Sequence, residues 1–312
     1  MNYVLTELNY PSKNGVDTIH GYIYAPVSGE VRGIVQLAHG MIDYVGRYHF
    51  LIDALTKDGY VFAGNDHIGH GKSAPSPEKL GFYPGKNGAT DMVRDLHTMN
   101  KILRERFPGA PIVMLGHSMG SFLSRLYIEK YPHTAEGHII HGTSGPMNAT
   151  VKAGKLLVKL VSALKGDDHR SKLIDSVAFS SYNTKFPKAE GKHAWLTREV
   201  ELVNGRDDDP FTNFKFTCSG FYQLFTALGD VSCGKWFKNY PKSMNTLILG
   251  GTMDPVGQYG KGCEKVYKKL LLEGCNAISI KLYDGARHEL FNESCRDEVF
   301  ADILAWLDVI TK

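Results

Sequence analysis

The chain has 312 residues, of which 43% are hydrophobic, which is enough for one sizeable core. Its formal net charge of +3 is too small to indicate a nucleic-acid-binding protein. Five cysteines, an odd number without a C-x-x-C pair, disfavour a disulfide framework and a thiolate zinc site. A polar N-terminus and the lack of a long apolar run disfavour secretion and membrane spanning, so we expect a cytoplasmic protein.

After two initial strands, the sequence alternates between predicted strands and helices. Short apolar runs bounded by glycine, proline and polar residues indicate the strands. One helix face is marked by Met92, Leu96, Met99 and Leu103, which recur at helical spacing. In this first part we expect strands at residues 1–10, 18–25, 34–38, 60–64, 111–115 and 139–141, and helices at residues 48–56, 89–107 and 118–131.

Residues 145–240 interrupt the alternation with segments that are mainly helical and with a polar loop at 204–210. The alternation then resumes, with strands expected at 246–249 and 277–283 and helices at 260–272 and 294–310. Ser294 stands where it could cap the last of these helices, with an aspartate three positions on.

This order of elements predicts an α/β fold. Strands separated by helices need crossover connections, which require a mostly parallel sheet covered by helices on both faces. The two antiparallel strands at the start are expected at one edge. We therefore expect a core made of residues 1–144 and 241–312, and a largely helical cap made of residues 145–240. The cap would lie over the carboxyl edge of the strands, where open α/β sheets bind ligands.

The strongest functional signal is the G-x-S-x-G sequence at 116–120, which lies between a predicted strand and an amphipathic helix. A sharp turn there would push the Ser118 hydroxyl out toward a substrate, while Gly116 and Gly120 would leave room for the crowded backbone. The helix N-terminus would bring partial positive charge to a developing oxyanion. We predict that Ser118 is a nucleophile; an ordinary glycine-flanked turn is the alternative.

A serine hydroxyl needs a general base at neutral pH. In folds of this class, the nucleophile is followed first by an acid and then by a histidine. His288 is the downstream histidine that directly follows a late predicted strand, so we predict that it is the base. His133 and His138 are expected at the surface or at helix ends.

The acid that orients the base should precede His288 and should also follow a strand. Asp254 meets both conditions, and Pro255 stiffens the chain behind it. Its rivals are Asp230, which lies inside the interrupting segment, and Asp284, which is too near His288 in sequence to come from another strand. We predict Asp254.

Two backbone N–H groups should hold the oxyanion. One is expected from Met119, the residue after the nucleophile. The other should come from the loop after the strand at 34–38, where His39, Gly40 and Met41 follow one another. We choose the N–H of Met41, with Gly40 allowing the backbone to come close; a plain turn at this position is the alternative.

The segment 66–73 contains His67 and His70 and invites comparison with a metal site. It is broken by glycines, and the sequence has no matching pair of carboxylates or thiolates elsewhere, so we expect a structural turn. No glycine-rich phosphate-binding motif occurs. We therefore expect no metal and no organic cofactor.

Residues 151–165 combine lysines on one side with leucines around the rest, as in helices that lie in a membrane interface. Transient contact with a membrane surface is one interpretation. The other is that this helix packs on the body of the protein. The sequence does not indicate an oligomeric state.

Taken together, the motifs resemble those of the monoacylglycerol lipase and lysophospholipase group of α/β-hydrolases, also described as serine-aminopeptidase-like hydrolases. The resemblance covers nearly the whole chain outside 145–240. It implies an α/β-hydrolase fold, the same triad and oxyanion positions, and a cap over an apolar tunnel for an acyl chain. It is carried by His39-Gly40-Met41, Gly46-Arg47-Tyr48, residues 66–73 and 116–120, Asp254-Pro255-Val256-Gly257 and Arg287-His288-Glu289.

The expected reaction is ester hydrolysis through an acyl-enzyme, with a monoacylglycerol or a lysophospholipid as substrate. Apolar residues between 211 and 225 would suit an acyl chain, or would only fill the core of the cap. One alternative is a carboxylesterase for short or aromatic esters. Another is a catalytically silent hydrolase fold used as a binding module. An aminopeptidase is less expected, because the cap has no clear acidic cluster for a substrate amine.

Overall fold

The computed structural model describes residues 2–311, and these form one eight-stranded sheet. Its order is β1-β2-β4-β3-β5-β6-β7-β8, with antiparallel pairing of β1 to β2 and of β2 to β4 and parallel pairing from there on. The predicted fold class is confirmed, including the antiparallel strands at one edge. The strands are β1 (Tyr3–Pro11), β2 (Thr18–Pro26), β3 (Gly33–Ala38), β4 (Tyr60–Asn65), β5 (Ile112–His117), β6 (Gly137–His141), β7 (Asn245–Gly251) and β8 (Ile278–Tyr283).

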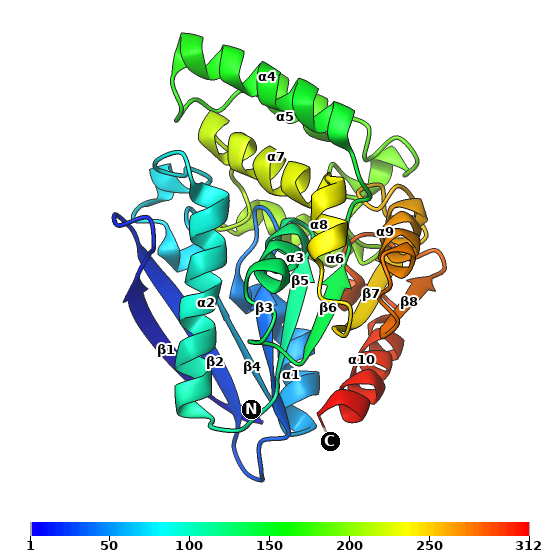
Figure 1. Ribbon diagram of the computed structural model, residues 1–312. Helices are drawn as coiled ribbons and strands as arrows, with labels where there is room; N and C mark the ends of the chain where they lie inside the picture. The colour runs from blue at the N-terminus through cyan, green and yellow to red at the C-terminus, as the bar shows by residue number, and fades with distance from the viewer. Residues whose placement is uncertain (1, 312) are drawn as a thin grey trace.

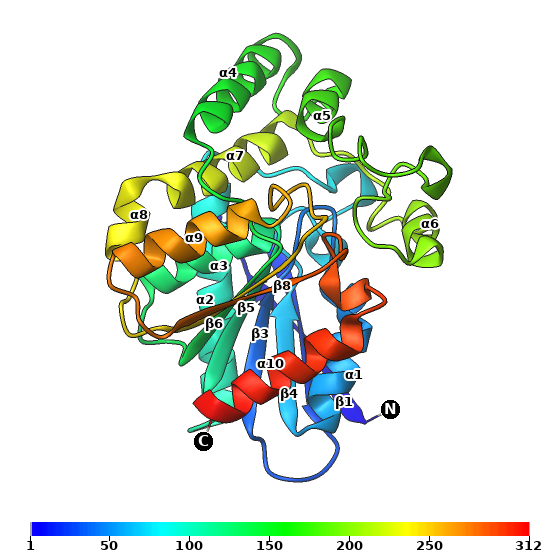
Figure 2. The same ribbon diagram turned by 90° about the vertical axis from the view of Figure 1, so that its right-hand side faces the viewer.

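Helices cover both faces of the sheet (Figure 1, Figure 2). One layer consists of α2 (Gly88–Arg106), α3 (Met119–Lys130) and α9 (Lys261–Leu272), and the other of α1 (His49–Lys57) and α10 (Arg296–Ile310). Side chains of each central strand enter the two layers in turn: on β5, Ile112 and Met114 join the first and Val113 and Leu115 the second. This double burial explains why these strands read as unbroken apolar runs.

Between β6 and β7 the chain leaves the sheet, and we refer to residues 145–240 of this stretch as the inserted segment. Both views show α4, α5 and α7 beyond the end of the sheet at which the parallel strands have their carboxyl ends (Figure 1, Figure 2). None of the helices within residues 2–311 combines the length and the apolar character needed to cross a membrane. The helices of the segment are α4 (Asn148–Lys165), α5 (Lys172–Phe179), α6 (Val200–Asp208), α7 (Cys218–Ser232) and α8 (Gly234–Asn239).

The prediction of a polar loop at 204–210 is wrong for most of this range, because α6 continues through Asp208. The sequence hides this helix because its buried edge is short: within α6 only Val203 and Arg206, three residues apart, are buried, and most of its other residues are polar or glycine. An arginine on the buried edge removes the apolar periodicity on which the prediction depended.

Two smaller predictions are also wrong. The last helix begins at Arg296 with Cys295 as its N-cap, and the backbone N–H of Ser294 instead donates to the Glu293 carboxylate. His138 is fully buried on β6, because that strand lies between β5 and β7. Five short 3-10 turns complete the described secondary structure: Val45–Tyr48, Gly71–Ser73, Pro77–Lys79, Lys188–Glu190 and Leu290–Asn292.

Candidate active site

Ser118 occupies a sharp turn between β5 and α3. Its φ of 54° and ψ of −119° lie outside the regions that serine normally adopts, a strain of about 1–3 kcal/mol that is common at functional sites. The neighbouring backbone leaves no space for side chains. A Cβ atom on Gly116 would lie 2.1 Å from Ser124 Oγ, and one on Gly120 would lie 1.9 Å from the Ala38 carbonyl oxygen. The two glycines are therefore required by packing around the turn.

The structure brings Asp254 and His288 together from the loops after β7 and β8. Asp254 Oδ2 lies 3.0 Å from His288 Nδ1, and the two side chains are only 1% and 2% exposed. The other carboxylate oxygen accepts the N–H of Val256 at 2.8 Å. A backbone hydrogen bond of 2.9 Å from Met253 to Ala286 ties the two loops to each other. The carboxylate can thus orient the imidazole and stabilise its charged form.

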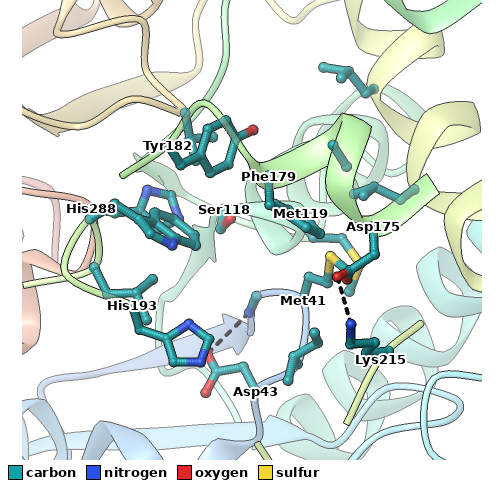
Figure 3. Close-up of a pocket in the computed structure, with 18 of the residues that line it drawn as sticks. Met41, Asp43, Ser118, Met119, Asp175, Phe179, Tyr182, His193, Lys215 and His288 are labelled. Atoms are coloured by element: carbon teal, nitrogen blue, oxygen red, sulfur yellow. Dashed lines mark hydrogen bonds and ion pairs between the residues drawn. The ribbon is translucent and has the colours of Figure 1, made fainter. Parts of the chain in front are cut away.

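Ser118 and His288 line the same cavity (Figure 3). The imidazole packs between the rings of His117 and Trp195, at centroid distances of 4.9 Å and 5.1 Å. Within residues 2–311, no hydrogen bond joins the Ser118 hydroxyl to His288. Catalytic hydrogen bonds of this kind often tighten only when substrate is bound.

The rival carboxylates lie elsewhere. Asp284 is exposed and accepts the Thr252 hydroxyl at 3.1 Å. Asp230 is a residue of α7, where burial raises the pKa of its carboxyl group. Among the described residues, the ion pair of His288 is with Asp254.

The two predicted oxyanion residues also meet at this cavity. Met119 is the first residue of α3, and Met41 follows β3; both line the cavity beside Ser118 (Figure 3). A Cβ atom on Gly40 would lie only 3.3 Å from the Ser118 Cβ, so the loop after β3 passes directly against Ser118. The arrangement allows two backbone N–H groups to approach an oxygen bound at Ser118.

His39 supports that loop from below. Its Nε2 accepts the N–H of His67 at 2.9 Å, and burial holds the pKa of His39 well below its usual value, with His70 adding to the effect. Segment 66–73 is a structural turn, as expected, because the Asp66 carboxylate accepts the N–H groups of Val45 and Lys72. Within the described part of the chain, no three histidine, cysteine or acidic side chains are grouped so that they could hold a metal ion.

Sequence reasoning gave no role to a chain of charges at the cavity, of which Asp43, Arg206 and Glu289 line the cavity and Arg47 lies behind them. Arg47 lies 2.9 Å from both Asp43 Oδ1 and Glu289 Oε2, and Arg206 of α6 lies 3.1 Å from Glu289 Oε1. Burial opposes ionisation of Glu289, but Arg47 and Arg206 outweigh it and hold the pKa of this residue well below its ordinary value. The opposite charges in Gly46-Arg47-Tyr48 and Arg287-His288-Glu289 were the available signal for the first pair. No comparable signal in the sequence indicated Arg206.

A cavity of about 1150 Å³ opens over Ser118. The apolar residues between 211 and 225 are divided between two places: Phe214 and Phe225 line the cavity, whereas Phe216 and Phe221 are buried in the core. Polar groups at the cavity include an ion pair of 3.0 Å between Lys215 and Asp175 (Figure 3). Its apolar wall opposite the sheet is formed by Leu157, Phe179, Leu224, Phe225 and Leu228.

Comparison with known proteins gives the family. The family model described as serine aminopeptidase, S33, matches residues 29–295. A crystal structure of a highly thermostable carboxyl esterase from Bacillus coagulans, in complex with glycerol, is 30% identical, with a TM-score of 0.91 over 99% of both chains.

Two curated relatives are named as lipases. A monoglyceride lipase from Saccharomyces cerevisiae is 28% identical over 97% of this chain and 93% of its own length. A monoacylglycerol lipase from Mycolicibacterium smegmatis is 24% identical over 97% of this chain and 96% of its own length. The chain therefore belongs to the serine aminopeptidase S33 family of α/β-hydrolases, and within it to the esterases and lipases of the monoglyceride lipase group.

Proposed function

We propose that the protein hydrolyses monoacylglycerols, or single-chain lipid esters close to them such as lysophospholipids. The observation that carries this proposal is the cavity of about 1150 Å³ over Ser118, whose far wall consists of apolar side chains. An acyl chain would lie along this wall, because burying its methylene groups contributes about 0.8 kcal/mol each. The names of the two curated relatives support the same substrate class.

In the proposed mechanism, His288 takes the Ser118 proton as Oγ attacks the ester carbonyl carbon. The N–H groups of Met41 and Met119 hold the resulting oxyanion, and Asp254 stabilises the imidazolium. His288 then gives the proton to the leaving alcohol oxygen as the carbon–oxygen bond breaks, which leaves an acyl-enzyme. Water, deprotonated by His288, attacks the acyl-enzyme, and His288 returns that proton to Ser118 Oγ as the acyl–oxygen bond breaks and the fatty acid is released. The mechanism needs no metal and no organic cofactor.

Residues 145–240 would act as the cap of this enzyme. The segment supplies Leu157, Phe179 and Leu224 to the cavity from three different helices, so its packing decides how long an acyl chain can enter. The residues that perform the chemistry come from the core, and the residues that select the substrate come from the cap.

The outer surface of the cap supports transient contact with a membrane. On α4, Leu156, Leu160 and Leu164 are 60%, 57% and 85% exposed, and lysines flank them on the same helix. A helix of this kind can insert its leucines between lipid headgroups. Co-sedimentation with anionic vesicles should fall when the three leucines are replaced by serine. Equal binding by the variant and the original protein would contradict this role.

A second candidate is a carboxylesterase for short or aromatic esters, favoured by the similarity to the Bacillus coagulans esterase. The two functions separate when p-nitrophenyl acetate, butyrate, octanoate and palmitate are compared with monooleoylglycerol and lysophosphatidylcholine. The lipid proposal predicts that kcat/KM rises with chain length and that monooleoylglycerol is cleaved. A maximum at acetate or butyrate, without cleavage of either lipid, would favour the carboxylesterase. Amino acid p-nitroanilides test the aminopeptidase alternative in the same assay.

A further inference from the structure

We propose that Arg206, a residue of the inserted segment, is a positioning residue that holds the oxyanion loop and the His288 loop in register. This inference rests on the proposed function. Arg206 is 7% exposed, so its guanidinium is committed to contacts inside the protein. It touches neither Ser118 nor His288 directly, and acts through the residues next to them.

The guanidinium joins two loops that come from opposite ends of the sequence. Its Nη2 donates to the Ile42 carbonyl oxygen at 2.8 Å, and its Nη1 donates to Glu289 Oε1 at 3.1 Å. Ile42 directly follows Met41, and Glu289 directly follows His288. A planar guanidinium can serve both acceptors in fixed directions, which a lysine ammonium cannot do with the same geometry.

Ile42 needs such support because its backbone is strained. Its φ of 53° is unfavourable for a β-branched residue and persists only where the surroundings fix it. Its N–H donates to His70 Nε2 at 3.3 Å, and its carbonyl accepts Arg206. Burial lowers the pKa of His70 to about 4, so the ring is neutral at pH 7 and can accept that hydrogen bond. Losing Arg206 releases one of these two restraints, one residue away from the Met41 N–H.

The surrounding charges allow Arg206 to be removed without unfolding the site. Glu289 also accepts both terminal nitrogens of Arg47, at 3.1 Å and 2.9 Å, and the Asn292 side chain at 2.8 Å. Its carboxylate therefore stays paired in an Arg206 variant. The Ile42 carbonyl is the acceptor that loses its contact with the guanidinium.

Arg198 offers a matched control from the same segment. Its Nε lies 2.7 Å from Glu293 Oε2, so it also joins the inserted segment to a core carboxylate near His288. It contacts neither Ile42 nor Glu289. Its replacement tests what the loss of an ordinary ion pair between the segment and the core costs.

The experiment measures p-nitrophenyl butyrate hydrolysis and thermal unfolding for the wild type and for Ser118→Ala, Arg206→Gln, Arg206→Lys, Arg206→Gly and Arg198→Gln. Because small misplacements of catalytic groups are costly, kcat should fall roughly 10- to 100-fold in Arg206→Gln. KM should stay within about twofold, since contacts shared by substrate and transition state are kept. Arg206→Lys should be impaired, and low-millimolar guanidinium should restore part of the kcat of Arg206→Gly. Arg198→Gln should lower the Tm and keep a kcat near the wild-type value.

Each outcome of this experiment either supports or overturns the positioning role of Arg206. An unchanged kcat in folded Arg206→Gln, or wild-type kcat in Arg206→Lys, overturns the positioning role while the hydrolase function stands. An equal loss of kcat in Arg198→Gln reduces Arg206 to a general attachment of the segment. If Arg206→Gln does not fold, Arg206→Lys and guanidinium rescue of Arg206→Gly decide the matter. Wild-type hydrolysis no greater than that of Ser118→Ala overturns the proposed function and the positioning role together.

Discussion

The two walls of the cavity differ in how they are built. On the sheet side, Met41, Ser118 and Asp254 follow buried strands and His288 follows the edge strand β8, and the loops that carry Asp254 and His288 are tied together by a backbone hydrogen bond. On the other side, the inserted segment contributes apolar side chains from several helices and leaves leucines such as Leu164 85% exposed on its outer surface. Under the proposed function, the sheet would fix the chemistry and the inserted segment would set the choice of substrate.

The largest expected effect comes from removing the charge of Asp254, the carboxylate on the sheet side of the cavity. Asp254→Asn should lower kcat roughly 10⁴-fold, because an amide favours the wrong imidazole tautomer and does not stabilise the imidazolium. Asp284→Asn, which changes an exposed carboxylate on the neighbouring loop, should stay within about twofold. Steady-state kinetics on p-nitrophenyl butyrate measure both. Equal effects would remove Asp254 from the triad.

The positions of Ser118, Asp254 and His288 could be predicted from the sequence for a physical reason. Ser118 lies in a local motif, and His288 and Asp254 each directly follow a recognisable strand, so neighbouring residues carry the signal. Arg206 and its partner Glu289 are separated by 83 positions in the sequence, and the helix that carries Arg206 lacks an apolar stripe. Long-range polar contacts of this kind leave no local pattern.

Low pH should reduce the stability of the protein, mainly through buried histidines on the sheet side. Burial lowers the pKa of His193 in the inserted segment and of a larger set of histidines outside it: His39, His67, His70, His117, His138 and His141. Below pH 6.5 the unfolded chain binds protons that the folded chain does not, so the free energy of unfolding falls as the pH decreases. Asp66 and Asp95, whose pKa values burial raises to about 6, act in the opposite direction but are fewer.

We therefore expect a nearly constant Tm from pH 8 to about pH 6.5 and a steep fall toward pH 5, where each buried neutral histidine contributes about 1.4 kcal/mol per pH unit. Differential scanning calorimetry across this range measures the profile. A Tm that rises on acidification would show that the carboxyl groups dominate instead.

Glycine substitutions compare how tightly the core around the sheet and the inserted segment are packed. A Cβ atom on Gly120 would lie 1.9 Å from the Ala38 carbonyl oxygen, whereas one on Gly234 in the inserted segment would have nothing within 4 Å. Gly120→Ala should therefore cost about 3 kcal/mol of unfolding free energy through overpacking. Gly234→Ala should be neutral or slightly stabilising. Urea unfolding of both variants tests the contrast, which fails if the two midpoints shift alike.

A substitution in the inserted wall should change the substrate and leave the chemistry intact. Leu224→Trp fills part of the cavity with a larger ring. We expect kcat/KM for p-nitrophenyl palmitate to fall about 10-fold, since a few methylene groups lose their place. The value for p-nitrophenyl acetate should change by less than about twofold. A parallel loss for both esters would mean that this wall also carries catalytic geometry.

The central claim is that the strained turn after β5 presents a reactive serine. Intact-mass spectrometry and peptide mapping after treatment with a fluorophosphonate probe test it most directly. The account predicts one covalent adduct, on Ser118, that is absent from the Ser118→Ala variant and forms much more slowly in Asp254→Asn. No adduct on the folded wild-type protein, or an adduct on a different residue that persists in Ser118→Ala, would contradict it.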